Sequence, residues 1–227
     1  MKITFISDTH TKHKQLDLSG GDLLIHAGDI MNSGYSAYDI EDFCNWFDGL
    51  EQYDHKVFIA GNHDRMFEDT PEKAMEIVNS YKWIDYLQDS TIEVGDDNET
   101  AKIYGSPWQP EFYNWAFNLP RRGDGLMAKW GAIPKDTDIL ITHGPPQGHL
   151  DISGPPHNVG DLGCELLRVK VDEQPPKIHV FGHIHGSYGY KFHNGTHFIN
   201  ASVLNERYDQ VNKPMTIDWD KETNEIK

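Results

Sequence analysis

Short runs of apolar, mostly β-branched residues recur along the 227-residue chain and predict buried β-strands. Five runs stand out: Ile3–Ile6, Leu23–Ile25, Val57–Ile59, Ile139–Ile141 and Ile178–Phe181. Segments with helical spacing of apolar residues lie between some of them. Because strands that alternate with helices build sheets covered by helices, the pattern predicts an α/β fold.

The helical pattern is clearest between the second and third runs, where apolar residues recur every three or four positions at Ile40, Phe43, Cys44, Phe47 and Leu50. Ser36 and Asp39 resemble a capping box at the start of that helix. Thr70 and Pro71 predict a second helix, with a capping hydroxyl followed by proline at the first helical position. Two further helices are expected after Asp161 and over Leu126–Trp130.

Composition and charge narrow the class of protein. The chain is 37% hydrophobic and 25% charged, and it contains no apolar segment long enough for a membrane span. The formal net charge of −16 repels phosphate backbones and argues against binding of extended nucleic acid. A small anionic substrate remains compatible with this charge, because bound divalent cations reverse the local potential at a site.

The first residues read as a strand that ends in a carboxylate, not as a signal peptide. Cys44 and Cys164 lie too far apart in sequence to suggest a disulfide framework or a cysteine zinc module, so we expect a reducing, cytoplasmic setting. No linker or repeat interrupts the sequence, and a single domain over residues 1–227 is therefore expected.

Residues that can bind a metal ion follow each of the five apolar runs. They are Asp8-Thr9-His10, Gly28-Asp29, Gly61-Asn62-His63-Asp64, His143-Gly144 and Gly182-His183-Ile184-His185. In an open α/β sheet, ligands bind at the carboxyl ends of the strands, so these side chains are expected to converge on one site. A glycine precedes the ligand in three clusters, where a sharp strand exit with positive φ and room near an ion are both expected.

The side chains in these clusters favour a transition metal. Two aspartates, one asparagine and four histidines form a mixed oxygen and nitrogen set without thiolate, which suits Mn²⁺, Fe or Zn²⁺ better than Ca²⁺. Seven ligands are too many for one ion. A carboxylate bridging two ions about 3.5–4 Å apart accounts for the surplus, and such a pair catalyses displacement at phosphorus. The sequence therefore predicts phosphoester hydrolysis.

Most of the 13 histidines need a different explanation. His26 and His179 lie within apolar strands and are interpreted as hydrogen-bonded core residues. Five others are interpreted as loop or surface residues: His13, His55, His157, His193 and His197.

The order Asp-x-His, Gly-Asp, Gly-Asn-His-Asp, His and Gly-His-x-His, from Asp8 to His185, resembles the calcineurin-like metallophosphoesterases. Three further stretches resemble, within that superfamily, the metallophosphoesterase-domain-containing proteins of animals and bacteria: Gly105-Ser106-Pro107-Trp108-Gln109-Pro110, Thr142-His143-Gly144-Pro145-Pro146 and Val180–His185. The closer resemblance extends through Asn200-Ala201-Ser202.

This resemblance implies a fold and a ligand set. The fold is a four-layer αββα sandwich with two mixed β-sheets, the second of which includes strands near Lys102–Tyr104 and Phe198–Asn200. One metal would be held by Asp8, His10, Asp29 and His185, and the other by Asp29, Asn62, His143 and His183. Asp29 would bridge two divalent ions, with Mn²⁺ favoured and Fe, Zn²⁺ or Ni²⁺ as alternatives. His63 would stabilise the transition state or protonate the leaving oxygen. Asp64 either orients His63 or is a surface carboxylate.

One departure from the superfamily bears on the substrate. Its protein phosphatases carry Gly-Asp-x-x-Asp-Arg-Gly, whereas this chain has Gly28-Asp29-Ile30-Met31-Asn32-Ser33-Gly34, without the Asp-Arg pair. Arginine recognises phosphate with two hydrogen bonds, so its absence favours a small phosphodiester, with cyclic nucleotides the suggested class, over a phosphoprotein. The expected reaction is attack of a metal-bound hydroxide on phosphorus. A phosphomonoesterase acting on nucleotides or proteins, and a non-catalytic nucleotide-binding protein, are the alternatives.

The sequence offers fewer candidates for contacts with the substrate than for metal ligands. The segment from Trp108 to Phe117 is rich in aromatic residues and is either a loop ordered by its own aromatic core or a surface that stacks a nucleobase, with Trp108 as the candidate. Asn32 and His149 follow predicted ligands closely enough to reach the substrate. Arg121 and Arg122 fit a phosphate contact and a solvated loop equally well.

Overall fold

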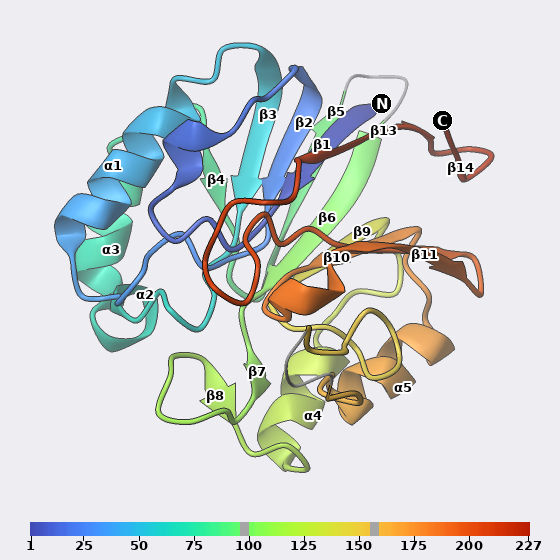
Figure 1. Ribbon diagram of the computed structural model, residues 1–227. Helices are drawn as coiled ribbons and strands as arrows, with labels where there is room; N and C mark the ends of the chain where they lie inside the picture. The colour runs from blue at the N-terminus through green and yellow to red at the C-terminus, as the bar shows by residue number, and fades with distance from the viewer. Residues whose placement is uncertain (96–99, 155–158) are drawn as a thin grey trace.

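The computed structural model describes residues 1–95, 100–154 and 159–227. Two six-stranded mixed sheets pack face to face, and helices cover the outer face of each sheet (Figure 1). This arrangement confirms the predicted α/β class and the four-layer αββα sandwich.

The first sheet has the strand order β14-β13-β1-β2-β3-β4. Its strands β1 to β4 are parallel, and β13 pairs antiparallel with β1. The strands are β1 (Lys2–Ile6), β2 (Gly21–His26), β3 (Tyr53–Phe58), β4 (Asp85–Tyr86), β13 (Met215–Asp220) and β14 (Glu225–Ile226).

The second sheet has the order β11-β12-β10-β9-β6-β5, with parallel strands in the centre and antiparallel strands at both edges. Its strands are β5 (Ser90–Gly95), β6 (Thr100–Ser106), β9 (Ile139–Thr142), β10 (Ile178–Phe181), β11 (Gly189–His193) and β12 (Thr196–Asn200). The predicted strands near Lys102–Tyr104 and Phe198–Asn200 are thus β6 and β12. A small parallel pair, β7 (Gln109–Pro110) and β8 (Asn118–Leu119), stands apart from both sheets (Figure 1).

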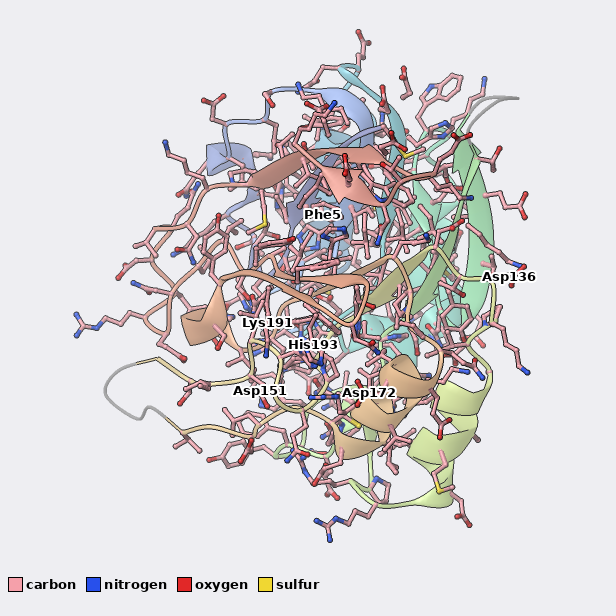
Figure 2. All side chains as sticks on the ribbon, turned by 90° about the vertical axis from the view of Figure 1, so that its right-hand side faces the viewer. Phe5, Asp136, Asp151, Asp172, Lys191 and His193 are labelled. Atoms are coloured by element: carbon pink, nitrogen blue, oxygen red, sulfur yellow. The ribbon has the colours of Figure 1, made fainter. Side chains whose placement is uncertain are left out.

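The helices divide between the two outer faces. Helices α1 (Ala37–Asp48), α2 (Met66–Asp69) and α3 (Pro71–Val78) lie on the side of the first sheet (Figure 1). Helices α4 (Asp124–Gly131) and α5 (Glu165–Glu173) lie on the side of the second sheet. Figure 2, turned by 90°, shows Asp172 of α5 on the same side as Lys191 and His193 of β11. Two 3₁₀ turns, η1 (His13–Gln15) and η2 (His185–Ser187), complete the regular structure of the described residues.

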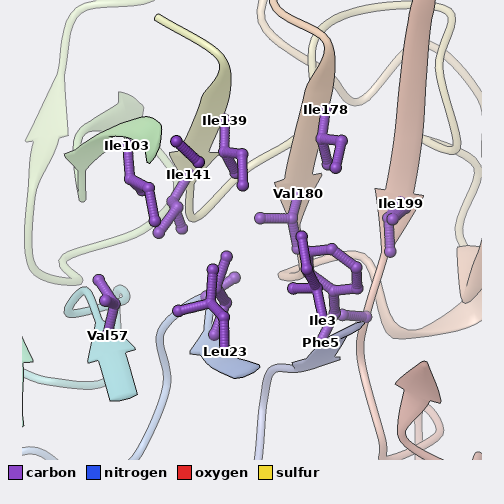
Figure 3. Packing of buried hydrophobic residues seen from close by; sticks show 14 of the residues in the cluster. Ile3, Phe5, Leu23, Val57, Ile103, Ile139, Ile141, Ile178, Val180 and Ile199 are labelled. Atoms are coloured by element: carbon purple, nitrogen blue, oxygen red, sulfur yellow. The ribbon is translucent and has the colours of Figure 1, made fainter. Parts of the chain in front are cut away.

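The main hydrophobic core fills the space between the two sheets. Ile3, Phe5, Leu23 and Val57 of the first sheet face Ile103, Ile139, Ile141, Ile178, Val180 and Ile199 of the second (Figure 3). Because both faces of the central strands are buried, these strands read as continuous apolar runs in the sequence. The runs that predicted the strands are therefore also the residues that hold the two sheets together.

The helix predictions are correct in position but only partly correct in their caps. The Ser36 hydroxyl accepts a hydrogen bond from the backbone N–H of Asp39 at 3.3 Å, as the capping box predicts. Thr70 does not cap α3, because its hydroxyl donates to the carbonyl of Met66 in α2 instead. The helix expected after Asp161 begins later, at Glu165, and its cap is Cys164, whose Sγ accepts from the N–H of Leu167.

Among the other histidines, His26 and His179 are buried as predicted and bond to Thr9 and Thr142, respectively. The interpretation of His13 and His197 as surface residues is wrong, because both are buried. His13 pairs with Asp42 at 3.3 Å, and His197 is hydrogen-bonded on both ring nitrogens. His55 is partly exposed, His193 is exposed, and His157 lies outside the described residues. No helix in the described ranges combines the length and hydropathy that crossing a bilayer requires.

Candidate metal centre

The carboxyl ends of strands from both sheets meet at one edge of the sandwich. Asp8, Asp29 and Asn62 follow β1, β2 and β3 of the first sheet, whereas His143 and His183 follow β9 and β10 of the second. A bridge between Ser7 and Ser202 joins the two sheets at this edge. The fold therefore brings together residues that are as far apart in sequence as Asp8 and His185.

One half of this cluster surrounds Asp8. The Nε2 atom of His185 lies 3.3 Å from Oδ1 of Asp8. Ligand atoms of Asp8, His10 and His185 all lie within 4.8 Å of one another, which is close enough for a shared cation.

The other half surrounds Asn62, and Asp29 lies between the two halves. The Oδ2 atom of Asp29 is 3.4 Å from Nε2 of His143 and 3.6 Å from Nε2 of His10. The Oδ1 atom of Asn62 lies 2.9 Å from Nε2 of His143 and 2.7 Å from Nδ1 of His183. All seven predicted metal-binding side chains are thus neighbours, and Asp29 lies between the two groups.

The imidazole rings are oriented for metal binding. The Nδ1 atoms of His10, His143 and His185 lie 2.9, 2.9 and 3.0 Å from the backbone carbonyls of Met31, Ala27 and Asn205. These carbonyls can only accept, so each Nδ1 carries its proton and Nε2 is the ring atom that faces the centre, where it can bind an ion once it carries no proton. Nε2 of His10 is buried without a hydrogen-bond partner in the described structure. Such an orphaned acceptor fits a bound divalent ion.

The backbone at the site is strained. Asp8, His10, Asp29 and His183 have φ values of 54, 40, 60 and 66°, which non-glycine residues rarely adopt. Strain of this kind persists where the surrounding structure enforces it, and it is common at functional sites.

The glycines before the ligands act differently from one another. Only Gly28 has positive φ, at 99°, so the expectation of positive φ holds for one of the three. A Cβ atom at Gly61 would collide with Oδ1 of Asp29, and one at Gly182 would collide with Oδ2 of Asp8. Gly61 and Gly182 therefore leave room for the carboxylates that the site requires.

Charge balance keeps the two carboxylates ionised. Burial alone would raise the pKa of Asp8, but the positive charge of His185 lowers that pKa below its usual range. Burial would also raise the pKa of Asp29, and the adjacent His143 lowers it well below its usual value. Burial would lower the pKa values of His143 and His185, but the neighbouring aspartates raise them to about 9.

Asp64 neither contacts the His63 ring nor lies on the surface, so both sequence alternatives are wrong. Its side chain is fully buried and accepts four backbone hydrogen bonds. Their donors are Asp29 and Ile30 at 2.9 and 3.2 Å, Met31 at 2.8 Å, and Gly61 at 2.7 Å. Asp64 thereby ties the loop after β2 to the loop after β3, and each loop carries a predicted metal ligand.

His63 lies beside the predicted metal ligands and is held by three contacts. Its backbone N–H donates to Oδ1 of Asp29 at 2.7 Å, and its Nδ1 lies 2.6 Å from the carbonyl of Asn32. The indole of Trp115 stacks on the imidazole, with ring centroids 4.0 Å apart and an interplanar angle of 25°. The sequence predicted that Asn32 could reach the substrate, but its observed contact with the site is through its carbonyl.

A cleft of about 630 Å³ opens onto this cluster. Asp29, Asn62, His63 and His183 form its inner side, and Phe112 and Tyr113 line it from the β7–β8 segment. The aromatic segment thus has two parts, because Phe117 is buried in a hydrophobic core whereas Phe112 and Tyr113 are exposed at the cleft.

Two of the predicted substrate contacts lie elsewhere. The Trp108 indole donates to Asp89 at 2.8 Å and packs under the Lys129 ammonium, outside the lining of the cleft. His149 is buried and stacks on Phe198 with centroids 3.9 Å apart, also away from the cleft. It lies next to His193, which Figure 2 shows near Lys191.

Arg121 and Arg122, for which the sequence allowed either a phosphate contact or a solvated loop, lie in different surroundings. Arg121 lines the cleft, but its guanidinium is bound to Glu165 at 2.8 Å and to the carbonyls of Gly163 and Leu162. Arg122 is exposed and lies 3.6 Å from Glu165. Neither therefore presents an unpaired guanidinium to the centre.

Two residues of the site were not assigned from the sequence. Ser202 donates to Oδ2 of Asp8 at 2.6 Å, and its only signal was its place in the resembling stretch Asn200–Ser202. The ring of Tyr208 lies 4.8 Å from that of His10 and 5.4 Å from that of His185, and it lines the cleft. Nothing in the local sequence around Tyr208 marks it, because the loop that carries it has no strand or helix pattern.

The fold and this cluster define a metal-dependent phosphoester hydrolase, and comparison with known proteins agrees. The family model for calcineurin-like phosphoesterases matches residues 1–187, so the chain belongs to that family. Metallophosphoesterase domain-containing protein 1 of Homo sapiens is 40% identical, over 94% of this chain and 69% of that protein. These matches confirm the resemblance found in the sequence.

Solved structures with low sequence identity share the fold. TT1561 of Thermus thermophilus superposes with a TM-score of 0.66 at 13% identity, covering 100% of this chain and 96% of that one. The phosphopantetheinyl hydrolase of Mycobacterium tuberculosis gives a TM-score of 0.58 at 14% identity, covering 91% of this chain and 90% of that one.

Proposed function

We propose that the protein hydrolyses small organic phosphodiesters, with cyclic nucleotides as the leading class, using two divalent metal ions. The observation that carries this proposal is the convergence of Asp29 and six other candidate oxygen and nitrogen ligands, beside a cleft that also holds His63. Manganese is the favoured metal on the chemistry of the donor set, with Fe, Zn²⁺ and Ni²⁺ as alternatives.

In this proposal, Asp8, His10, Asp29 and His185 hold one ion, and Asp29, Asn62, His143 and His183 hold the other. The bound pair would supply an activated water and neutralise the charge that develops on the phosphate. The protein's part is to fix the ligands, which the carbonyls of Met31, Ala27 and Asn205 and the hydroxyl of Ser202 do through hydrogen bonds.

His63 is assigned as the acid that assists the leaving oxygen. Its Nδ1 proton is directed to the carbonyl of Asn32, so Nε2 is the atom that can give a proton to the substrate. The ring lines the cleft and contacts His10 edge to face at 4.6 Å, which places it beside the proposed ions.

The lining of the cleft favours a diester over a monoester. A monoester carries an additional negative charge, yet Arg121 is the only lysine or arginine among the described residues that line the cleft, and it is paired with Glu165. Phe112 and Tyr113 instead offer aromatic surface to an organic ester group.

A paired assay tests the proposal. Protein reconstituted with Mn²⁺, Ni²⁺, Fe²⁺ or Zn²⁺ is given a phosphodiester, for example a cyclic nucleotide, and a matched phosphomonoester. We expect diester turnover to dominate and to fall by about 100-fold or more in Asn62→Ala and His183→Ala, because each removes a metal ligand. His55→Ala, at a partly exposed position on β3, is the matched control.

The outcomes separate the alternatives. Dominant turnover of the monoester would assign a phosphomonoesterase instead. Tight binding of two metals and of nucleotide without turnover of either ester would assign a non-catalytic binding protein, and would overturn the proposal.

A further inference from the structure

We propose that the Tyr208 hydroxyl donates a hydrogen bond to a non-bridging oxygen of the substrate phosphate, in a site that lacks the phosphate-binding arginine of related phosphatases. This inference rests on the proposed function, since it concerns a phosphate bound at the same metal centre.

The Tyr208 ring lies over the metal-binding cluster. Its centroid is 4.8 Å from that of His10, 5.4 Å from that of His185 and 6.3 Å from that of His63. The first two rings meet it edge to face, with interplanar angles of 65 and 75°. Tyr208 also lines the cleft together with Asp29 and His63. A phosphate that contacts both His63 and the ions proposed to bind Asp29 would therefore lie next to Tyr208 in the cleft.

The loop around Tyr208 holds it in a strained conformation. Its φ is 62°, which is rare for a non-glycine residue and costly for a bulky one. The Oδ1 atom of Asn205 accepts from the N–H groups of Arg207 and Asp209 at 2.8 and 2.9 Å, and the N–H of Tyr208 donates to the carbonyl of Asn205 at 2.8 Å. The Lys12 ammonium also bonds to the carbonyl of Tyr208. A surface loop without strand or helix is thus fixed so that one aromatic side chain faces the site.

The same loop supports a metal ligand. The carbonyl of Asn205 accepts from Nδ1 of His185 at 3.0 Å, so the turn that positions Tyr208 also orients His185. The placement of Tyr208 is therefore coupled to the geometry of the proposed metal site.

The chemistry of the hydroxyl suits a phosphate. Within the part of the chain that the structure describes, no hydrogen bond engages the Tyr208 hydroxyl, and the residue lines the cleft beside the predicted metal ligands. A phenol donates without adding charge. It can therefore stabilise a phosphate oxygen while the metal ions neutralise the charge, and it replaces part of what an arginine would provide.

The decisive variant is Tyr208→Phe, which removes the hydroxyl and retains the ring against His10. We expect kcat for the phosphodiester to fall by about 100-fold, as for loss of one transition-state donor, with little change in KM. Orthovanadate mimics the transition state, so its inhibition constant should weaken by a similar factor, while the content of bound metal stays the same. Tyr38→Phe, an exposed tyrosine on α1 with 70% of its surface accessible, should behave as the wild type.

Wild-type kcat and vanadate affinity in Tyr208→Phe would overturn the inference. A loss of bound metal that accounts for the loss of activity would also overturn it, because the role would then be support of His185. Failure of the proposed function gives a different result, in which the wild type hydrolyses no phosphoester. The affinities of the wild type and of Tyr208→Phe for vanadate and inorganic phosphate can then still be compared, and they test the phosphate contact alone.

Discussion

Asp64 shows how a single side chain can hold two parts of a site in register. Its carboxylate accepts four backbone hydrogen bonds from the loops after β2 and β3, and these loops carry Asp29 and Asn62. A carboxylate is suited to this role because it offers acceptors in several directions and no donor.

We expect Asp64→Ala to lower the free energy of unfolding by roughly 3 kcal/mol or more, because buried N–H groups without partners each cost about 1–3 kcal/mol. Metal affinity should fall as well, since Asp29 and Asn62 lose their common support. Urea unfolding and a metal titration measure the two effects. Asp54→Ala, on an exposed position of β3, should change neither; equal stability of the two variants would contradict the assignment.

Trp115 acts on His63 rather than on the substrate. Its indole stacks on the imidazole with ring centroids 4.0 Å apart, and His10 contacts the same imidazole edge to face. Because the ring is held by these neighbours and by the carbonyl of Asn32, its Nε2 should point consistently into the cleft.

If His63 protonates the leaving oxygen, Trp115→Ala should lower kcat by about tenfold for diesters with a poor alkyl leaving group, and much less for those that release p-nitrophenolate. The readout is kcat against the pKa of the leaving group. Trp83→Ala, at an indole that is 60% exposed, is the control. An equal loss for all leaving groups would show that Trp115 supports the fold and not proton transfer.

His179 provides a pH-dependent contribution to stability away from the metal-binding residues. Burial, with His149 nearby, lowers its pKa to about 3. The unfolded chain therefore binds a proton on this residue that the folded chain does not, and stability falls as the pH drops from the unfolded pKa of about 6.5 towards 3.

In His179→Gln this titration is absent, and Thr142 retains an amide partner. At pH 7 the variant should be somewhat less stable than the wild type. Between pH 7 and pH 5 the wild type should lose about 2 kcal/mol more than the variant. Urea denaturation at the two pH values measures the difference, and parallel losses in the two proteins would contradict the low pKa.

Elements differ in how far the sequence predicts them. The five central strands and α1 were predictable because their buried residues form a clear pattern of apolar positions in the local sequence. The strands β4, β7, β8, β11, β13 and β14 were not predicted, since they are very short or carry many exposed side chains. The predicted N-caps of α3 and α5 were wrong for two reasons. The Thr70 hydroxyl bonds to the carbonyl of Met66 instead, and α5 begins at Glu165, so Cys164 and not Asp161 is its N-cap.

The candidate site follows the same division. The clustering of its predicted metal ligands was predictable because parallel strands end at one edge, so a repeated motif in the sequence becomes a cluster in space. The positions of Tyr208 and Trp115 beside the site were not predicted, because each lies on a loop, and only tertiary contacts bring these loops to the site. Trp108 and His149 are close in sequence to site residues, yet contacts with Asp89 and Phe198 hold them elsewhere.

The β7–β8 segment is the element expected to select the organic part of the substrate. Asn118 organises it: Oδ1 accepts from the N–H of Phe112 at 3.4 Å, and Nδ2 donates to the carbonyls of Phe112 and Tyr113 at 3.3 and 2.9 Å. These bonds fix the two aromatic residues at the cleft.

Asn118→Ala should release this segment and raise KM for a cyclic nucleotide by roughly three- to tenfold, the range expected for one or two hydrogen bonds. Turnover of a dimethyl phosphodiester should remain the same, because it has no aromatic group to contact. Asn45→Ala on the exposed face of α1 is the control. If KM rises equally for both diesters, the segment serves the site as a whole and does not recognise the base.

At the scale of the whole molecule, the two sheets meet at the hydrophobic core and at the cluster of predicted metal ligands. Asp8, Asp29 and Asn62 come from the first sheet, and His143, His183 and His185 from the second. We propose that residues 1–227 form one domain for this reason, because neither sheet carries a complete ligand set.

Metal ions that bind this cluster should therefore stabilise the association of the two sheets. At a free metal concentration about 100 times Kd, one site contributes about 2.7 kcal/mol to the free energy of unfolding. For a chain of this length, removing the ions with a chelator should lower Tm by roughly 5–10 °C. Calorimetry should show one transition with and without metal, and the shift should be much smaller in His183→Ala. Two separate transitions would argue against a single domain, and an equal shift in His183→Ala would place the stabilising metal outside the cluster around Asp29.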